Sequence, residues 1–460
     1  MIVMKFGGTS VEDANAIKNL KEIVKKEIPQ KPVIVVSACA GITNQLLQTA
    51  TLASHGKKEE ALNNVVAIES RHKKIVKDLF DGDTQKFLNR HFAQIAEELT
   101  ALVNGVAVLG ELTPRSLDTF AAYGELMSSF IIHHYLESEK IKSFWVDARS
   151  FMKTDEHFTK AAVQFDATEQ KLKEIVQPKV DNGYVVMTQG FIGSSSHGIT
   201  TTIGRGGSDY SAAIIGALLN ADDIQIWTDV DGILTSDPSV VKDAKKIKVM
   251  SFNEAAELAY FGARVLHPET ILPAVKKNIP VRVLNSKNPL SSGTLIVAKP
   301  KIDKRCVVKS IAYKEGITLI SIVSTRMFLA HGFLENVFDV FHKYETVVHT
   351  VATSEVSVTV TIDNVKNLPN IVRELKHFST VTVTDKKAIV CIVGDNLRNS
   401  PGLAVKMLSP ITDVNINMIS QGASEINLSF VIDEEFVDDV VLRLHKALFA
   451  NAGQFAEIFE

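Results

Sequence analysis

Short apolar runs rich in β-branched residues alternate with helical patterns along the first 285 residues. The runs are IVMKF, PVIVVSA, KSFWVDA, GYVVMTQGF, DDIQIWTDV and PVRVL, which begin at residues 2, 32, 142, 183, 222 and 280. Each run has the length and composition of a strand, and helical spacing fills the segments between them. This alternation predicts a mostly parallel sheet that is covered by helices on both faces.

Residues 56–138 differ from the rest of this region, because consecutive helical patterns fill them with little strand character. The helix over TPRSLDTFAAYGELMSSFIIHHYL is expected to begin with Thr113 as its N-cap and Pro114 as its first residue. Glu125 then lies in the middle of this helix. His133 and His134 follow on the same helix, where adjacent side chains point in different directions, so we expect no shared metal site.

A boundary is predicted at residues 285–305, where turn residues, two prolines and several lysines accumulate. Beyond it the sequence repeats: ISIVS at 320 recurs as VCIVG at 390, and TSEVSVTVTID at 353 recurs as ASEINLSFVID at 423. Each copy predicts the order βαββα. The second copy lacks a fourth strand, which RCVVKSIAYK at 305–314 could supply, so that the first copy would be nested inside the second.

The amino-acid composition argues against several classes of function. The 460 residues suggest about three domains, and 45% hydrophobic residues can fill their cores. Lysine plus arginine (50) nearly balances aspartate plus glutamate (53), so no basic field favours nucleic acid or a membrane surface as a partner. Three widely spaced cysteines predict no disulfide framework and suit the cytoplasm. No apolar run reaches the roughly 18 residues of a membrane span, and no targeting segment is expected.

The residues that could bind a ligand or take part in catalysis lie in loops that contain small residues. TTIGRGGSDYSAAIIGA, residues 201–217, places three glycines, an arginine, a serine and an aspartate directly before a predicted helix, where free N–H groups can bind an anion. Its spacing matches neither the Walker A pattern nor the dinucleotide fingerprint. In KFGGTS, residues 5–10, a lysine beside glycine N–H groups suits phosphoryl transfer, although a plain turn with a solvated lysine is the alternative. In SACAGITN, residues 37–44, the Thr43 hydroxyl could donate to a carboxylate, and a plain turn is again the alternative.

Seven motifs occur in a fixed order before the TSEVSV repeat: KFGGTSV, SACAGITN, GELMS, TQGFIG, TTTIGRGGSDYSAA, WTDVDGI and FGARVLHP. Together they closely resemble aspartate kinase, most strongly its single-function, lysine-sensitive type, over nearly the whole chain. The resemblance implies an α/β fold, with a three-layer αβα amino-acid kinase domain over residues 1–300. Two ferredoxin-like (βαββαβ) ACT regulatory domains would follow, the first at 314–385 and the second at 304–313 plus 386–460.

The implied activity is transfer of the γ-phosphoryl group of ATP to the side-chain carboxylate of L-aspartate, at the start of lysine, threonine and methionine synthesis. The acceptor carboxylate is ionised at neutral pH, so the reaction needs control of charge rather than a general base. The resemblance implies that Lys5 and Asp209 are catalytic, with Asp209 orienting Lys5 on the migrating group. Arg205 would grip the α-carboxylate with its planar guanidinium. An ion pair within the loop is the alternative for Arg205 and Asp209.

Other binding residues follow from the same resemblance. For aspartate they are Thr43, Glu125, Gly206 and Ser208 beside Arg205, and Glu125 would accept the α-ammonium group, which offsets the cost of burying a carboxylate. Phe191 would line the site, unless it is a plain core aromatic. For ATP they are Lys5, Phe6, Gly7, Gly8, Thr228, Asp229, Leu234, Ser239, Arg264 and Val265, although Thr228 and Asp229 could equally form a turn. Leu234, Ser239 and Arg264 depart from the usual Tyr, Arg and Lys, which weakens the expectation for the nucleotide. The only metal implied is Mg²⁺, held mainly through phosphates.

The ACT domains are expected to bind an amino-acid effector, lysine or threonine, and to form a homodimer. The effector residues implied are Met327, Gly332, Phe333, Leu334, Val348, His349, Ser354 and Glu355. His349 stands where a strand carboxylate is expected, so we expect lysine inhibition to be weak, absent or dependent on a co-effector. Two alternatives remain: a kinase that acts on another amino acid such as glutamate, and an amino-acid sensor whose kinase domain is inactive.

Overall fold

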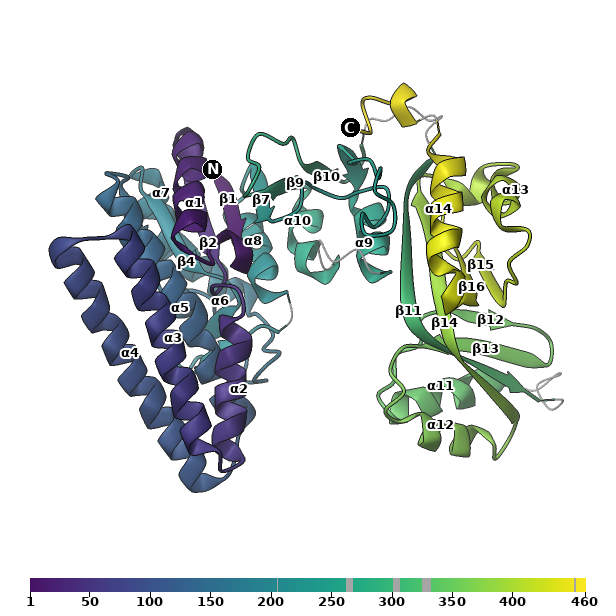
Figure 1. The fold of residues 1–460 in the computed structure, drawn as a ribbon, viewed down its shortest axis with the longest axis horizontal. Coiled ribbons are helices and arrows are strands. Elements are labelled where there is room, and N and C mark those ends of the chain that lie inside the picture. The colour runs from purple at the N-terminus through teal and green to yellow at the C-terminus, as the bar shows by residue number, and fades with distance from the viewer. Residues whose placement is uncertain (205, 262–267, 301–306, 325–331, 451) are drawn as a thin grey trace. The chain divides into compact units, whose positions relative to one another are not determined.

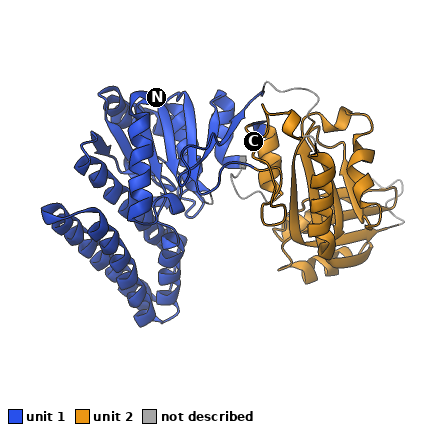
Figure 2. Ribbon diagram, turned by 45° about the horizontal axis from the view of Figure 1, so that its top comes forward, with its two compact units in different colours: residues 1–233, 249–252, 265–300 blue, residues 234–248, 253–264, 301–460 orange. Residues whose placement is uncertain are grey.

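The computed structural model describes the chain except at residues 205, 262–267, 301–306, 325–331 and 451. The chain forms two compact units, which Figure 2 shows in blue and orange. The first comprises residues 1–233, 249–252 and 265–300, and the second comprises residues 234–248, 253–264 and 301–460. Residues 234–248 and 253–264 therefore group with the second unit, whereas the sequence assigned them to a domain over 1–300. The predicted domain limits themselves stay a prediction.

An eight-stranded sheet forms the centre of the first unit, in the order β3-β4-β2-β1-β7-β9-β10-β8. Its strands are β1 (Ile2–Phe6), β2 (Pro32–Val36), β3 (Ser143–Trp145), β4 (Val185–Gln189), β7 (Asp223–Thr228), β8 (Val249–Ser251), β9 (Val281–Asn285) and β10 (Thr294–Val297). Neighbouring strands run parallel, except β9 and β10. Every residue of β1, β2 and β4 is buried, as in a sheet covered on both faces. All six predicted strands lie in this sheet.

Helices cover this sheet and give a three-layer αβα arrangement (Figure 1). They are α1 (Ala14–Glu27), α2 (Ile42–Ser54), α3 (Lys58–Leu79), α4 (Gly82–Leu109), α5 (Pro114–Ser138), α6 (Phe165–Lys171), α7 (Gln177–Asp181), α8 (Gly207–Leu218) and α10 (Leu272–Lys277), beside a small hairpin of β5 (Ile192–Ser194) and β6 (Thr200–Thr202). Ile2, Met4 and Phe6 share one face of β1 and pack in one apolar cluster with α1 to α5. Thr113 caps α5 by accepting a hydrogen bond from the Ser116 N–H, as predicted.

Helix α4 is long and apolar enough to cross a membrane by length and composition alone, although the sequence analysis expected no such run. Its buried residues are Leu88, Phe92, Ile95, Leu99, Val103 and Val106, which recur at helical spacing and belong to the apolar cluster of the first unit. This spacing is that of an amphipathic helix packed on a core.

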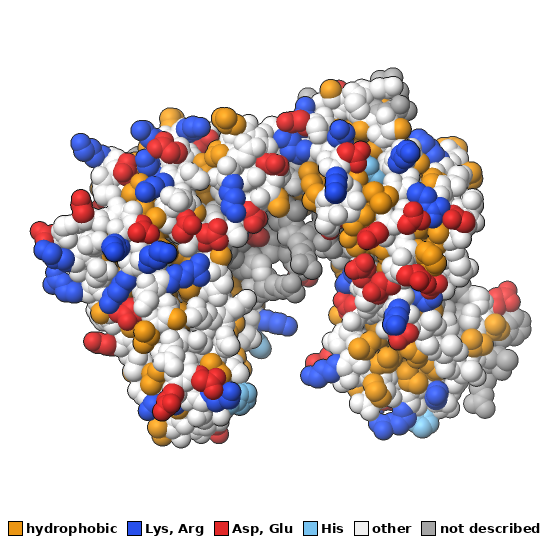
Figure 3. All heavy atoms as spheres, in the orientation of Figure 1, with side chains coloured by type: hydrophobic (Ala, Val, Ile, Leu, Met, Phe, Trp, Pro, Cys, Tyr) orange, Lys and Arg blue, Asp and Glu red, His pale blue; other side chains and the backbone are white. Residues whose placement is uncertain are grey.

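On the face shown in Figure 3, basic and acidic side chains are interspersed, as the near balance of charges predicts.

The second unit contains a six-stranded antiparallel sheet in the order β12-β13-β11-β14-β16-β15. Its elements are β11 (Val308–Val323), β12 (Val351–Thr353), β13 (Ser357–Ile362), β14 (Thr380–Gly394), β15 (Met418–Gln421) and β16 (Asn427–Asp433), with helices α9 (Phe252–Tyr260), α11 (Phe333–Lys343), α12 (Leu368–Leu375), α13 (Leu403–Leu408) and α14 (Val437–Leu448). From β11 onward the element order repeats strand, helix, strand, strand, helix, as the 70-residue offset between 320 and 390 predicts.

Two long strands, β11 and β14, each serve both repeats. Residues 318–323 of β11 pair with β13, whereas residues 308–314 pair with the end of β14 that also pairs with β16. The register between the two strands shifts after Lys314, close to Gly316, which has a φ of 70°. Residues 308–314 thus provide a fourth strand beside the second repeat. This pairing supports the nested arrangement that the sequence suggested.

Candidate active site

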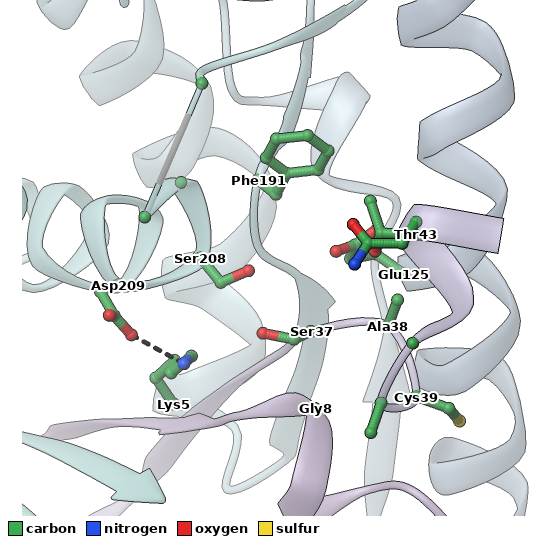
Figure 4. A pocket seen from close by; sticks show the side chains of 16 residues that line it. Lys5, Gly8, Ser37, Ala38, Cys39, Thr43, Glu125, Phe191, Ser208 and Asp209 are labelled. Atoms are coloured by element: carbon green, nitrogen blue, oxygen red, sulfur yellow. Dashed lines mark ion pairs between the residues drawn. The ribbon is translucent and has the colours of Figure 1, made fainter. Parts of the chain in front are cut away.

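A pocket of about 370 Å³ opens in the first unit beside the carboxyl ends of β1, β2 and β4 (Figure 4). In open α/β sheets this edge is where ligands bind. The pocket brings together predicted residues from the three loops and from α5: Lys5, Gly8, Thr43, Glu125, Gly206, Ser208 and Asp209. Arg205, the predicted clamp for the α-carboxylate, lies outside the described residues.

Lys5 and Asp209 form an ion pair at the base of this pocket. The Lys5 Nζ lies 2.7 Å from the Asp209 Oδ1, and the two side chains are 11% and 16% exposed (Figure 4). Lys5 belongs to the central strand β1, and Asp209 lies in the first turn of α8. A pair so shielded from water is stronger and less sensitive to salt than a surface pair. The carboxylate therefore fixes where the ammonium group can act.

Glycines allow α8 to begin this close to the sheet. Gly206 precedes the helix with a φ of 73°, a conformation that glycine adopts without strain. A Cβ on Gly190 would lie 2.6 Å from the Ser208 Cα, and one on Gly207 would lie 2.7 Å from the Phe191 Cδ2. The helix start also offers N–H groups and a positive dipole end, which suit an anionic ligand.

Glu125 is a buried carboxyl group that lacks a full set of partners. It lies in α5, lines the pocket and is 3% exposed, and its Oε2 has no hydrogen-bond partner among the described residues. Burial raises the pKa of Glu125 to about 8, against a smaller lowering by the Ala38 N–H. Gly124 lets α5 approach this loop, because a Cβ there would lie 2.7 Å from the Ala38 Cβ. A buried polar atom without a partner at a pocket wall marks a place for a ligand group.

Phe191 lies on the pocket wall, as the sequence suggested, with an unusual backbone. Its φ is 66°, which is rare for a bulky residue. Its N–H donates to the Ser211 Oγ at 3.0 Å, and its carbonyl oxygen accepts from the Ile203 N–H at 3.0 Å. Backbone strain held in this way is concentrated at functional sites.

The residues predicted for ATP do not form one described site. The Phe6 side chain is fully buried and stacks on Trp227 at 5.9 Å, so Phe6 can offer only backbone atoms. The Thr228 Oγ1 donates to the Asp229 Oδ1 at 3.2 Å, which is the local bond of the turn alternative. Leu234 and Ser239 belong to the second unit. Gly7 and Gly8 follow β1, and Arg264 and Val265 lie outside the described residues.

The predicted effector residues lie in the second unit, apart from Met327, which is not described. Gly332 precedes α11 with a φ of 82°, and Phe333 and Leu334 begin that helix. Val348 comes before β12, and Ser354 and Glu355 lie in the exposed turn between β12 and β13.

His349 makes contacts that the sequence did not reveal. Its Nε2 lies 3.0 Å from the Asp363 Oδ1, and its Nδ1 lies 2.8 Å from the Tyr260 hydroxyl. The Lys314 Nζ lies 2.7 Å from the other Asp363 oxygen. A carboxylate is therefore present beside His349, but a lysine already neutralises it. These partners come from three separate segments, so sequence spacing gave no signal for them.

The expectation that His133 and His134 point apart was wrong. The Glu137 Oε2 lies 3.4 Å from the His133 Nε2 and 3.3 Å from the His134 Nδ1. Glu137 is one turn further along α5, between the two directions in which the imidazoles leave the helix. The three side chains therefore converge and could hold a metal ion.

Comparisons with known proteins agree on one family. Residues 1–285 match a model described as the amino acid kinase family, and residues 390–448 match an ACT domain model. The chain is 36% identical to lysine-sensitive aspartokinase 3 of Escherichia coli, with 98% of the chain and 99% of that protein covered. It is 37% identical to the chloroplastic aspartokinase 1 of Arabidopsis thaliana, with 99% and 81% covered.

Solved structures of Escherichia coli aspartokinase III are also similar. The complex with aspartate and ADP, in the R-state, has a TM-score of 0.84 at 36% identity, with 98% of this chain and 100% of that chain covered. The complex with lysine and aspartate, in the T-state, has a TM-score of 0.81 at 35% identity, with 98% and 99% covered.

The raised pKa of Glu125 predicts a pH-dependent effect on stability. The folded chain keeps this proton up to about pH 8, whereas the usual pKa of glutamate is 4.5, so the residue's contribution to stability is lost as pH rises from 4.5 to 8. Glu125→Gln has no proton to lose in this range, so the variant lacks this pH-dependent loss of stability. The melting temperature of the variant minus that of the wild type should therefore increase steadily between pH 5 and pH 8.5. Scanning calorimetry measures it, with the exposed Glu97→Gln as control, and a difference that is independent of pH would contradict the assignment.

Proposed function

The chain belongs to the aspartokinase family, and from this membership we propose how its residues transfer the γ-phosphoryl group of ATP to the side-chain carboxylate of L-aspartate. The enzyme makes 4-phospho-L-aspartate and ADP, the first step toward lysine, threonine and methionine, and it is regulated through its ACT domains. The observation that carries the residue assignments is one pocket that holds both the Lys5–Asp209 pair and the incompletely paired Glu125.

Lys5 is proposed to stabilise the charge that moves during transfer. An aspartate carboxylate oxygen attacks the γ-phosphorus, the bond to the β,γ-bridging oxygen breaks, and ADP leaves with that electron pair. No proton need be removed from the nucleophile, because a carboxylate is ionised at neutral pH. The fixed ammonium of Lys5 would then act on the phosphoryl oxygens, while Asp209 holds it in position.

Glu125 is proposed to accept the α-ammonium of aspartate. A substrate ammonium beside the Oε2 would give this carboxyl group a charge partner and a hydrogen-bond donor. Thr43, Gly206 and Ser208 line the same pocket and supply hydroxyl and backbone donors for the substrate carboxylates. Arg205 would add its guanidinium there, as the resemblance implies.

Mg²⁺ is proposed to arrive with ATP. The carboxylates among the described lining residues are Glu125 and Asp209, and Asp209 is already paired with Lys5. This lining offers no carboxylate cage, which fits a Mg²⁺ held mainly through phosphate oxygens. When bound, the ion neutralises phosphate charge.

Helix α9 is proposed to connect the ACT domains with nucleotide binding. Three of its side chains make polar contacts within the second unit. Glu254 forms an ion pair with Lys309 at 2.9 Å, and Glu257 accepts a hydrogen bond from the Asn427 side chain at 2.7 Å. The Tyr260 hydroxyl lies 2.8 Å from the His349 Nδ1. Lys309 and Glu254 are 0% and 2% exposed, so their geometry is tightly constrained. Residues 262–267 follow α9 in the sequence and carry Arg264 and Val265, which the resemblance assigns to ATP.

We also propose a cytoplasmic homodimer that forms through the second unit. Cys39 and Cys391 are free and buried, which suits a reducing compartment. Exposed apolar side chains such as Leu334, Phe338 and Ile419 provide surface that a second copy could cover.

The first functional prediction concerns Asp209→Asn. Loss of the charge that orients Lys5 should lower kcat by roughly 100- to 1000-fold, while the KM for aspartate changes little. A hydroxamate assay with aspartate, and with glutamate as the rival substrate, measures both constants. The exposed Asp181→Asn serves as control. Near wild-type turnover in the Asp209 variant would contradict the role of the ion pair, and a preference for glutamate would contradict the substrate.

The second prediction is that the KM for aspartate falls as pH rises. At pH 6.5 the Glu125 carboxyl group is mostly protonated, because burial raises its pKa to about 8, so binding an ammonium group must first remove that proton. The KM should fall roughly tenfold between pH 6.5 and pH 8. Glu125→Gln should raise the KM and abolish the slope. The KM for ATP is the internal control, and a parallel slope for ATP would refute the assignment.

The third prediction concerns lysine as the effector. Lys314 already forms an ion pair with Asp363, so this carboxylate is not free to bind the ammonium group of a lysine effector. Inhibition of the wild type by lysine should therefore be weak. Lys314→Met should lower the lysine concentration for half-inhibition about tenfold, and the exposed Lys366→Met should not. Burial lowers the pKa of His349, so any loss of lysine inhibition on acidification should occur below the usual histidine range. Tight inhibition of the wild type that Lys314→Met leaves unchanged would refute the idea.

A further inference from the structure

The last two turns of α5 hold a cluster of three side chains that the kinase reaction does not use: His133, His134 and Glu137. They follow Glu125 by about two to three helical turns. Adjacent ligands of a tetrahedral Zn²⁺ ion, with bonds of about 2.0–2.1 Å, are about 3.3–3.4 Å apart. The Glu137 Oε2 already lies 3.4 Å from the His133 Nε2 and 3.3 Å from the His134 Nδ1. Both carboxylate-to-imidazole distances therefore match a metal site.

Neither neutral tautomer of His134 suits its surroundings. Its ring lies edge to face with Phe130 and Phe87, at centroid distances of 4.6 and 5.5 Å, and its buried Nε2 has no hydrogen-bond partner among the described residues. If Nδ1 carries the proton, the Nε2 lone pair is buried without a donor. If Nε2 carries it, the Nδ1 lone pair faces the Glu137 carboxylate. A cation between Nδ1 and Glu137 removes the repulsion at Nδ1 and leaves the proton on Nε2.

The remaining contacts prepare the cluster for an ion. The His133 Nδ1 lies 2.9 Å from the Ser143 Oγ on β3, which fixes the imidazole with its Nε2 toward Glu137. The cluster lies at the C-terminal end of a 25-residue helix, where the helix dipole favours a cation. Glu137 is 49% exposed, so solvent can reach an open coordination position.

We propose that His133, His134 and Glu137 bind a divalent transition-metal ion of the Zn²⁺ class, with water completing its coordination. Two imidazoles and one carboxylate select Zn²⁺, Co²⁺ or Ni²⁺ over Mg²⁺, which prefers oxygen ligands. The ion joins side chains from the last two turns of α5, where Ser143 on β3 already holds His133, and so stabilises the C-terminal end of this helix without taking part in phosphoryl transfer.

Titration of the metal-free full-length protein with Co²⁺ and Zn²⁺ tests this site. We expect one Co²⁺ per chain with the visible absorption of tetrahedral cobalt, no thiolate charge-transfer band, and a rise in melting temperature with Zn²⁺. Glu137→Gln and His133→Asn should each weaken binding at least tenfold and remove the thermal shift, while kcat stays at the wild-type value. The control is His197→Gln, which disrupts the exposed pair of His197 with Glu156 and should leave metal binding unchanged.

Three results would overturn the proposal. The first is no Co²⁺ binding by the wild type at micromolar concentration. The second is a thiolate band, which would assign the ion to cysteine. The third is equal affinity in the wild type and in both cluster variants, with circular dichroism showing that the variants are folded.

Discussion

The ion pair between Lys5 and Asp209 determines how the first unit is built around its pocket. It joins the central strand to the first turn of α8 at 2.7 Å, so these two elements must meet closely. Gly190 and Gly207 make that approach possible, since a Cβ on either would collide with Ser208 or Phe191. The ammonium group of Lys5 is thus positioned by close packing of small residues. Attraction between the two groups alone would not fix their geometry.

Glu125 differs from this pair, because its Oε2 has no hydrogen-bond partner among the described residues. Burial raises its pKa to about 8, so the carboxyl group is mostly neutral near pH 7. A ligand that brings an ammonium group makes ionisation favourable, whereas a dicarboxylate without one gains nothing from it. If Glu125 accepts the α-ammonium group as proposed, the pocket distinguishes an amino acid from the corresponding simple diacid, even though both offer the same nucleophile.

Local signals in the sequence predicted much of this structure. The six apolar runs became strands, and Thr113 capped α5, because strand composition and capping depend on neighbouring residues. The loops around Lys5, Thr43 and Asp209 could be assigned to one pocket only through their resemblance to a family. The contacts of His349 with Tyr260 and Asp363 depend on how a helix and two strands pack, which spacing cannot reveal. His133 and His134 were misjudged, since helix geometry gives the direction of each Cβ but not where long side chains end.

In the second unit a single strand, β11, links two separate ion pairs. β11 carries Lys309, the buried partner of Glu254 on α9, and also Lys314, which contacts Asp363 beside His349. Its two halves pair in different repeats, and both pair with β14. A displacement of Asp363 therefore acts on the same strand that holds α9 through Lys309. Because a buried ion pair tolerates little displacement, α9 must follow β11 or lose the Lys309 contact.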